Sequence, residues 1–127
     1  MTEDEMTALV KAYFSAVDNK TIEGILATLT EDCRFTVESH GVELNGHDEI
    51  RAMFTKLWTK HKAVLHDQFV FAPAPAHNRV AVQFQVTNTL HDDSLRHKSN
   101  ANFFTVRGDR FDTVAVYMSG ENTLVKG

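Results

Sequence analysis

The sequence has one cysteine, Cys33, two prolines and six glycines among its 127 residues. A single cysteine excludes an internal disulfide, and no Pro- or Gly-rich linker marks a domain boundary. The 13 Lys and Arg are outnumbered by 17 Asp and Glu, giving a net charge of -4. Because phosphate backbones require basic surfaces, we expect no nucleic-acid partner. Apolar runs fall short of about 18 residues and the acidic start is unlike a secretory signal, so we expect a cytoplasmic protein without a membrane partner.

The first half of the chain has the apolar spacing of helices. Thr2 and Glu5 have the spacing of a capping box, and an apolar stripe follows at helical spacing: Met6, Leu9, Val10, Tyr13, Phe14 and Val17. The same spacing predicts a short second helix that begins at Ile22 and ends near residues 30–32. A third helix is expected after Asn45-Gly46, with Asp48 and Glu49 in its first turn.

The second half alternates between apolar and polar residues, which is typical of strands with one buried face. We expect four strands after the third helix, near residues 64–71, 80–87, 96–106 and 111–118, joined largely by hairpins. A shorter strand is predicted over residues 33–38. Helices segregated from an antiparallel meander predict an α+β domain, with the helices covering one face of a curved sheet.

Four segments in this order resemble the nuclear transport factor 2-like superfamily, which includes ketosteroid isomerases and SnoaL-like polyketide cyclases. They are Ala8–Val17, Gly24–Cys33, Gly46–Phe54 and Asn102–Gly108. The resemblance covers essentially the whole chain and implies a single domain over residues 1–127. It implies a cone-like roll, in which a curved, mainly antiparallel sheet wraps around a long N-terminal helix beside two further helices. It also implies a hydrophobic pocket at the wide end and a homodimer formed through the outer sheet face.

The resemblance places part of the ketosteroid isomerase machinery on this chain. In that enzyme an Asp base works beside an oxyanion hole made by a Tyr and a protonated Asp. The Tyr falls on Tyr13, and the oxyanion-hole Asp falls on Asn102, whose amide can still donate a hydrogen bond. The base falls on Val37, which cannot carry a proton. A catalytic role would therefore require another proton acceptor.

Three residues are candidates for that acceptor. Each of them is also compatible with a purely structural role. His40 follows in the loop at the expected pocket mouth and has the side chain best suited to proton transfer near neutral pH. Glu38 points outward on a regular strand. His66 resembles a His often present in SnoaL-like members, and its neighbour Asp67 faces the opposite way, so these two are not a ready-made pair.

The expected pocket has a larger set of lining residues on the faces that point inward. They are Phe35, Val37, Phe54, Trp58, Phe84, Asn88, Asn100, Phe104, Val116 and Met118. The amides of Asn88, Asn100 and Asn102 either orient a polar group of a ligand or lie hydrated at strand ends. No histidine or cysteine spacing typical of metal ligands occurs, so we expect no metal. The family resemblance implies no cofactor.

Two functions from different classes remain open. One is an enzyme that isomerises, cyclises or dehydrates a small hydrophobic carbonyl compound, using Tyr13 and Asn102 to stabilise an oxyanion. The other is a dimeric module that binds a small apolar ligand without chemistry, which the valine at position 37 favours. Phe103 is large, apolar and out of phase with the inner residues of its strand, which indicates an outer face that contacts a partner subunit.

Overall fold

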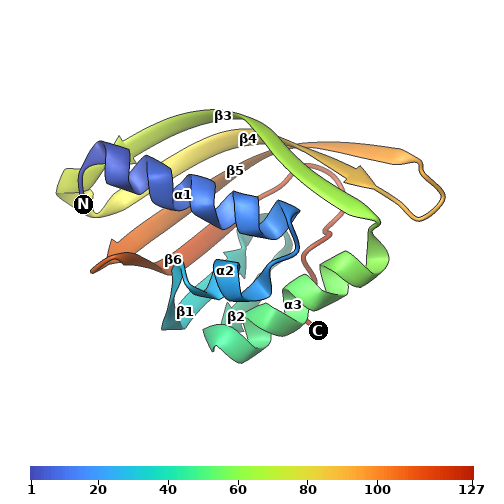
Figure 1. Ribbon diagram of the computed structural model, residues 1–127, viewed down its shortest axis with the longest axis horizontal. Coiled ribbons are helices and arrows are strands. Elements are labelled where there is room, and N and C mark those ends of the chain that lie inside the picture. The colour runs from blue at the N-terminus through green and yellow to red at the C-terminus, as the bar shows by residue number, and fades with distance from the viewer.

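A curved sheet packed on three helices forms the fold (Figure 1), and the computed structural model describes residues 1–127. The helices are α1 (Glu3–Asp18), α2 (Ile22–Leu26) and α3 (Gly46–Lys60). The strands are β1 (Leu29–Val37), β2 (Val42–Asn45), β3 (Ala63–Ala74), β4 (Arg79–Thr89), β5 (Leu95–Arg107) and β6 (Arg110–Tyr117). Short 3-10 turns lie at Glu38–His40 and Pro75–His77. None of the three helices combines the length and apolar character needed to cross a membrane.

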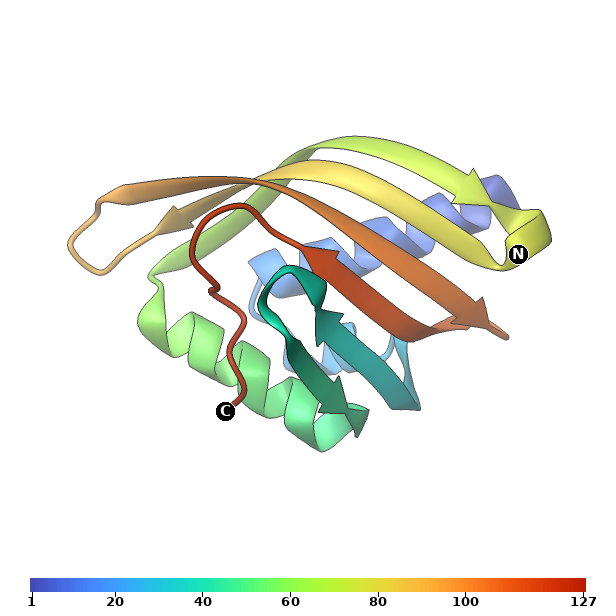
Figure 2. The same ribbon diagram turned by 180° about the vertical axis from the view of Figure 1, so that it is seen from behind.

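The sheet is open and mixed, with strand order β2-β1-β6-β5-β4-β3. All neighbouring pairs run antiparallel except β1 and β6, which are parallel. The long strands β3, β4 and β5 curve over α1, as the view from behind shows (Figure 2). The predicted α+β roll, with a mainly antiparallel sheet around a long N-terminal helix, is confirmed.

Local signals in the sequence explain where α1 begins. The backbone N–H of Thr2 donates to Glu5 Oε1 at 2.9 Å, and the N–H of Glu5 donates to Thr2 Oγ1 at 3.1 Å. This reciprocal pair is the predicted capping box, which satisfies N–H groups that lack partners at a helix start.

Two predictions about the region after α1 were wrong. The second helix ends at Leu26 rather than near residues 30–32, because Thr28 Oγ1 donates to the carbonyl of Ile25 at 2.6 Å and strand β1 begins at Leu29. Strand β2 was not predicted, since its four residues are too few to show a period. It pairs antiparallel with β1 and extends the sheet beside α3.

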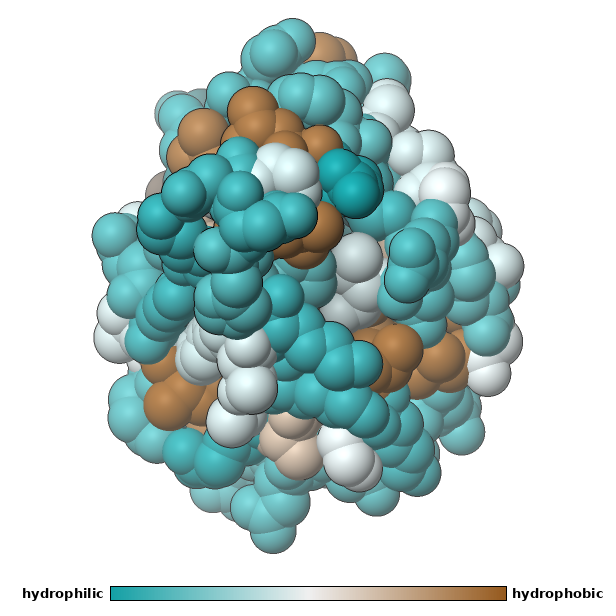
Figure 3. Space-filling model, turned by 90° about the vertical axis from the view of Figure 1, so that its right-hand side faces the viewer, coloured by the Kyte–Doolittle hydropathy of each residue, from teal (hydrophilic) through white to brown (hydrophobic).

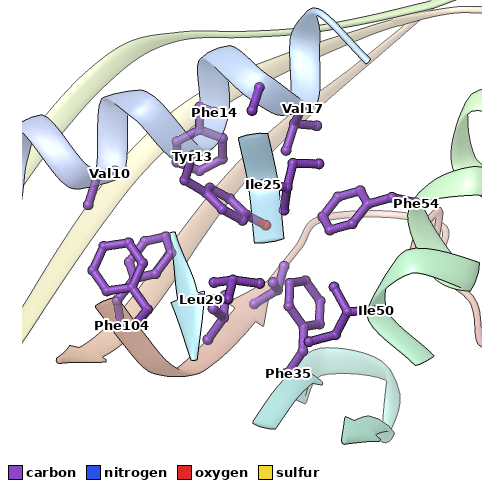
Figure 4. Packing of buried hydrophobic residues seen from close by; sticks show 14 of the residues in the cluster. Val10, Tyr13, Phe14, Val17, Ile25, Leu29, Phe35, Ile50, Phe54 and Phe104 are labelled. Atoms are coloured by element: carbon purple, nitrogen blue, oxygen red, sulfur yellow. The ribbon is translucent and has the colours of Figure 1, made fainter. Parts of the chain in front are cut away.

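The core lies between the sheet and the helices, and aromatic side chains fill its centre (Figure 4). Tyr13 makes edge-to-face contacts with Phe14, at 4.9 Å between ring centroids, and with Phe104, at 5.5 Å. Cys33 is fully buried in this cluster, and burial raises the pKa of its thiol to about 12, with Asp112 and Asp32 adding to the rise. The thiol therefore packs as a small apolar group.

Candidate functional site

An inner cavity of 30 Å³ lies between α1, α3 and the concave face of the sheet. Seven of the predicted site residues line it: Tyr13, Phe54, His66, Phe84, Asn100, Asn102 and Val116. Phe14, Val17, Leu57 and Leu124 complete the wall. The space is large enough for water and too small for an organic substrate. Polar side chains thus share a small, mainly apolar space.

His66 lines this cavity from strand β3, which carries a bulge directly after it. The register of β3 against β4 shifts between Asp67 and Val70, and Gln68 within the bulge has a φ of 55°. A bulge inserts an extra residue and re-aims the side chains around it. His66 shares the inner face with Val64 before the bulge and pairs with buried Val86. After the bulge the inward side passes to odd-numbered residues, so that Phe71 pairs with buried Val82.

The imidazole of His66 is held by Asp18, the last residue of α1. Asp18 Oδ1 lies 2.5 Å from His66 Nδ1, and Asp18 Oδ2 accepts the backbone N–H of His66 at 2.9 Å. A carboxylate only accepts hydrogen bonds, so Nδ1 carries the proton and Nε2 is the ring nitrogen left with a free lone pair in neutral histidine. One carboxylate therefore fixes the position, the orientation and the tautomer of the ring.

Solvent reaches the Asp18–His66 pair from the outside of the molecule. A surface groove of 360 Å³ runs between α1 and β3, and it is lined by Asp18 and by both Phe14 and His66 of the inner cavity. The His66 side chain is 11% exposed and that of Asp18 is 18% exposed. His66 therefore stands between the cavity and bulk water, where it can exchange protons with solvent.

Tyr13 points from α1 into the centre of the core, with its hydroxyl oxygen directed toward Phe54 (Figure 4). The residue is 2% exposed, and its hydroxyl makes no hydrogen bond within the protein. Burial raises the pKa of the Tyr13 hydroxyl far above its ordinary value, and nearby Cys33 and Asp18 add to the rise. The phenol stays neutral at physiological pH and is a free donor for an oxygen in the cavity.

Asn102 brings a second polar group to the same space. It is 2% exposed, and its Oδ1 has no hydrogen-bond partner. A buried amide without partners costs about 1–3 kcal/mol. The adjacent inner residue on β5, Asn100, is tied down, since its Oδ1 accepts the backbone N–H of Ser119 at 3.2 Å. The Oδ1 of Asn102 is thus an acceptor still available to a molecule in the cavity.

Residues 10–118 match the family model of the SnoaL-like domain. The chain belongs to the SnoaL-like family. No curated protein matches the chain.

Solved structures share the fold at low sequence identity. A protein from Xanthomonas campestris pv. campestris, provisionally named a polyketide cyclase, has a TM-score of 0.83 at 20% identity, with 90% of each chain covered. An NTF2-like protein from Burkholderia xenovorans has a TM-score of 0.74 at 20% identity, covering 94% of this chain and 92% of its own. A hypothetical protein with a ketosteroid isomerase-like fold from Catenulispora acidiphila, solved with trimethylamine, has a TM-score of 0.77 at 13% identity, covering 86% and 83%. The resemblance to this superfamily is confirmed.

The other predicted site residues of the SnoaL-like domain lie outside the inner cavity. His40 is exposed, with Nδ1 2.8 Å from Ser39 Oγ and Nε2 3.0 Å from the carbonyl oxygen of Gly120. Trp58 donates its indole N–H to the carbonyl of Val17 at 3.2 Å. Four buried apolar residues pack in the core elsewhere: Phe35, Val37, Phe104 and Met118. Glu38 is exposed in the turn after β1, and Asn88 lies in a different pocket.

The sequence did not single out two residues that shape the site of the SnoaL-like domain. Asp18 directly follows Val17 and lies one helical turn after Phe14, and this position at the edge of the buried stripe of α1 is the signal that could have found it. Leu124 closes the cavity from the segment after β6, which has no helix or strand and therefore no period to read.

Proposed function

We propose that this SnoaL-like protein is an enzyme that moves a proton on a small hydrophobic carbonyl compound. His66 is the general base, Asp18 orients it, and Tyr13 and Asn102 donate hydrogen bonds to the carbonyl oxygen. The observation that carries the proposal is the two-point hold of Asp18 on His66, in the wall of the cavity that Tyr13 and Asn102 also line. A positioned base beside a phenol and an amide that can donate hydrogen bonds is the arrangement that enolisation requires.

The first step is the same for isomerisation, cyclisation and dehydration. Nε2 of His66 takes a proton from the carbon next to the carbonyl, and the electrons of that C–H bond form a C=C bond. The carbonyl π electrons move onto oxygen, which accepts hydrogen bonds from the Tyr13 hydroxyl and the Asn102 amide. The imidazolium, stabilised by Asp18, then returns its proton to carbon in isomerisation or to a leaving hydroxyl in dehydration. In cyclisation the enolate carbon attacks a second carbonyl of the substrate, and the proton goes to the alkoxide formed there. The cyclase name carried by the Xanthomonas neighbour is consistent with this class.

A substrate requires more room than the inner cavity offers. Leu124 is the one wall residue contributed by the segment after β6, and this segment crosses from the sheet to α3 without regular structure (Figure 2). It is held through its backbone: Lys98 Nζ donates to the carbonyl of Ser119 at 2.7 Å, and His40 contacts that of Gly120. We therefore place the opening at Leu124, whose withdrawal enlarges the cavity without unpairing the sheet.

Hydrogen exchange on carbon tests the role of His66 with simple ketones in place of the natural substrate. The protein is incubated in D₂O with a panel of β,γ-unsaturated ketones and 1,3-diketones, and NMR follows deuterium entering next to the carbonyl. We expect His66→Gln to lower the rate about 10²–10⁴-fold. Asp18→Asn should lower it as well, because an amide no longer stabilises the imidazolium, and Tyr13→Phe should weaken the stabilisation of the oxyanion.

His40→Gln is the matched control, because it removes an exposed histidine outside the cavity. Its exchange rate should equal that of the unsubstituted protein. If His66→Gln keeps the full rate, or if His40→Gln loses it, proton transfer does not belong to His66 and the proposed function is wrong.

Val37 favours a second candidate function, binding without chemistry. This residue stands where the resemblance places the isomerase base, and it is fully buried and apolar. A binding module would give chemical-shift changes at cavity residues on adding an apolar ketone, with no deuterium entering it. The same NMR samples therefore separate the two functions.

We also propose that the outer face of the sheet binds a second copy of the chain. Phe103 of β5 and Tyr117 of β6 are 39% and 44% exposed and touch edge to face at 5.7 Å between centroids. The Arg79 guanidinium lies 5.7 Å from the Phe103 ring centroid. Exposed aromatic pairs are typical of interfaces. Phe103→Asp should shift sedimentation from dimer to monomer, whereas an unsubstituted protein that already sediments as a monomer would contradict this.

A further inference from the structure

A second cavity, which we call the hairpin pocket, opens beside the stem of the β4–β5 hairpin. It has a volume of 470 Å³ and lies between the end of α3, the two strands and the segment after β6. Its polar lining includes Lys60, His61, Asn88, Arg96, Lys98 and Glu121. No wall residue is shared with the inner cavity. Figure 3 faces this end of the molecule, where the surface is mostly hydrophilic with small separate apolar patches.

Asn88 is the buried polar group of this pocket. Its side chain is 1% exposed, and its Oδ1 has no hydrogen-bond partner. The strand pairing accounts for its burial, since Asn88 faces inward with Val86 and Phe84 and lies opposite Arg96 of β5 and Val64 of β3. Leaving a buried amide oxygen unpaired is unfavourable. A ligand that donates a hydrogen bond would satisfy it.

The charges around Asn88 are mainly positive, although the chain as a whole is acidic. Lys60, Arg96 and Lys98 form no ion pair with any carboxylate. Glu121 is the one acidic residue in the wall, and it meets Lys98 through its backbone carbonyl. Unpaired cations gathered around a pocket favour binding of an anion.

Lys98 and His61 are held in place and still have hydrogen-bonding capacity. Lys98 is 7% exposed, and its ammonium donates to the carbonyls of Ser119 and Glu121, which leaves one N–H without a partner. Burial lowers the pKa of Lys98, and Glu121 opposes that shift. His61, also 7% exposed, has Nδ1 2.8 Å from the carbonyl of Leu57, so its Nε2 is unpaired. These groups are preorganised for a ligand.

We propose that the hairpin pocket binds a small hydroxycarboxylic acid. The carboxylate lies among Lys60, Arg96 and Lys98, and the hydroxyl donates to Asn88 Oδ1. The volume suits a molecule of a few carbon atoms with a ring, because cavities of about 300–1,000 Å³ hold small organic ligands. Leu90 and Val125 supply the apolar part of the wall for such a ring. This site goes beyond the proposed function, since binding here requires no turnover at His66.

A matched set of four probes separates charge from the hydroxyl. Mandelate carries both groups, phenylacetate lacks the hydroxyl, mandelamide lacks the charge, and inorganic phosphate has charge without the ring. Binding is followed by ¹H–¹⁵N NMR titration, with shifts expected at Lys98, Gly120 and Glu121. Because charge-assisted hydrogen bonds contribute more than neutral ones, mandelamide should bind about tenfold or more weakly than mandelate, and phenylacetate more weakly by a smaller factor.

Variants assign these differences to residues. Arg96→Gln and Lys98→Met should each weaken mandelate binding about tenfold, and Lys11→Met on the far helix should not. Arg96→Gln keeps the test valid if Lys98→Met disturbs the segment after β6. Asn88→Leu should abolish the preference for mandelate over phenylacetate. His66→Gln should bind mandelate like the unsubstituted protein, which keeps this test independent of the proposed reaction.

Three outcomes would overturn the proposal. One is equal binding of mandelate and mandelamide, and another is no shift at the pocket with tens of millimolar mandelate. The third is phosphate binding at least as tight as mandelate, because the pocket would then recognise charge alone.

Discussion

The inner cavity and the hairpin pocket lie on the same concave face of strands β4 and β5, yet they differ in the polarity of their side chains and in volume. Along β5 the inward residues run from Phe104 through Asn102 and Asn100 to Lys98 and Arg96 at the hairpin. Side chains thus change from apolar to amide to cationic along one strand. The inner cavity is nearly filled at 30 Å³, whereas the hairpin pocket has 470 Å³.

This difference shows that the inward-facing positions of one strand, at every second residue, can serve folding at one end and binding at the other. Where α1 and α3 cover the sheet, inward side chains must be apolar, and aromatic packing stabilises the domain. Beyond the reach of α1 the irregular segment after β6 covers the sheet, and polar side chains persist there despite their cost. We therefore expect substitutions at the apolar end to change stability strongly and those at the polar end to change binding.

The largest effect is expected at the apolar end, from Phe104→Ala. Phe104 is fully buried against Tyr13 and Phe111, so truncation removes aromatic contacts and leaves a cavity. The free energy of unfolding, measured by urea titration, should fall by about 3–5 kcal/mol. Phe103→Ala is the matched control on the opposite face of β5. Because Phe103 is exposed, its truncation should cost the monomer less than about 1 kcal/mol.

An equal decrease in the free energy of unfolding in the two variants would contradict this prediction, since it would mean that the outer face is as tightly packed as the core. A dilution series distinguishes the cause. Loss of stability in Phe103→Ala that depends on protein concentration reflects the proposed dimer rather than packing within one chain.

Most of the fold could be predicted because its long elements repeat a simple period. The stripe of α1 and the alternation of β4 are each governed by burial of one face, and the capping box fixes where α1 starts. The errors came where local contacts decide the outcome. Thr28 ends α2 through a side-chain hydrogen bond, and β2 is set by pairing with β1 over four residues.

The candidate site was less predictable, because its geometry depends on contacts distant in sequence. Alternation with Val64 places His66 on the inner face, but its partner Asp18 lies on another element. The contact between the two does not follow from periodicity. Leu124 closes the cavity from an irregular segment, so only the folded chain reveals it. Asn88, Asn100 and Asn102 were recognisable as amides on apolar faces, but only the packing around them shows that Asn100 is paired while the other two have an unpaired oxygen.

The smallest effect is expected at the polar end and has the opposite sign. Asn88→Leu replaces an unpaired buried amide with an apolar side chain of similar size, so the free energy of unfolding should rise by about 1 kcal/mol. Asn100→Leu is the matched control on the same face, because Asn100 Oδ1 accepts the Ser119 N–H, and its loss should lower stability. Both are measured by urea unfolding without ligand.

A higher free energy of unfolding for Asn88→Leu, together with weaker mandelate binding, means that Asn88 is retained for a ligand at the expense of stability. A loss at both positions means that Asn88 is already satisfied in solution, and the hairpin pocket then lacks its unpaired acceptor.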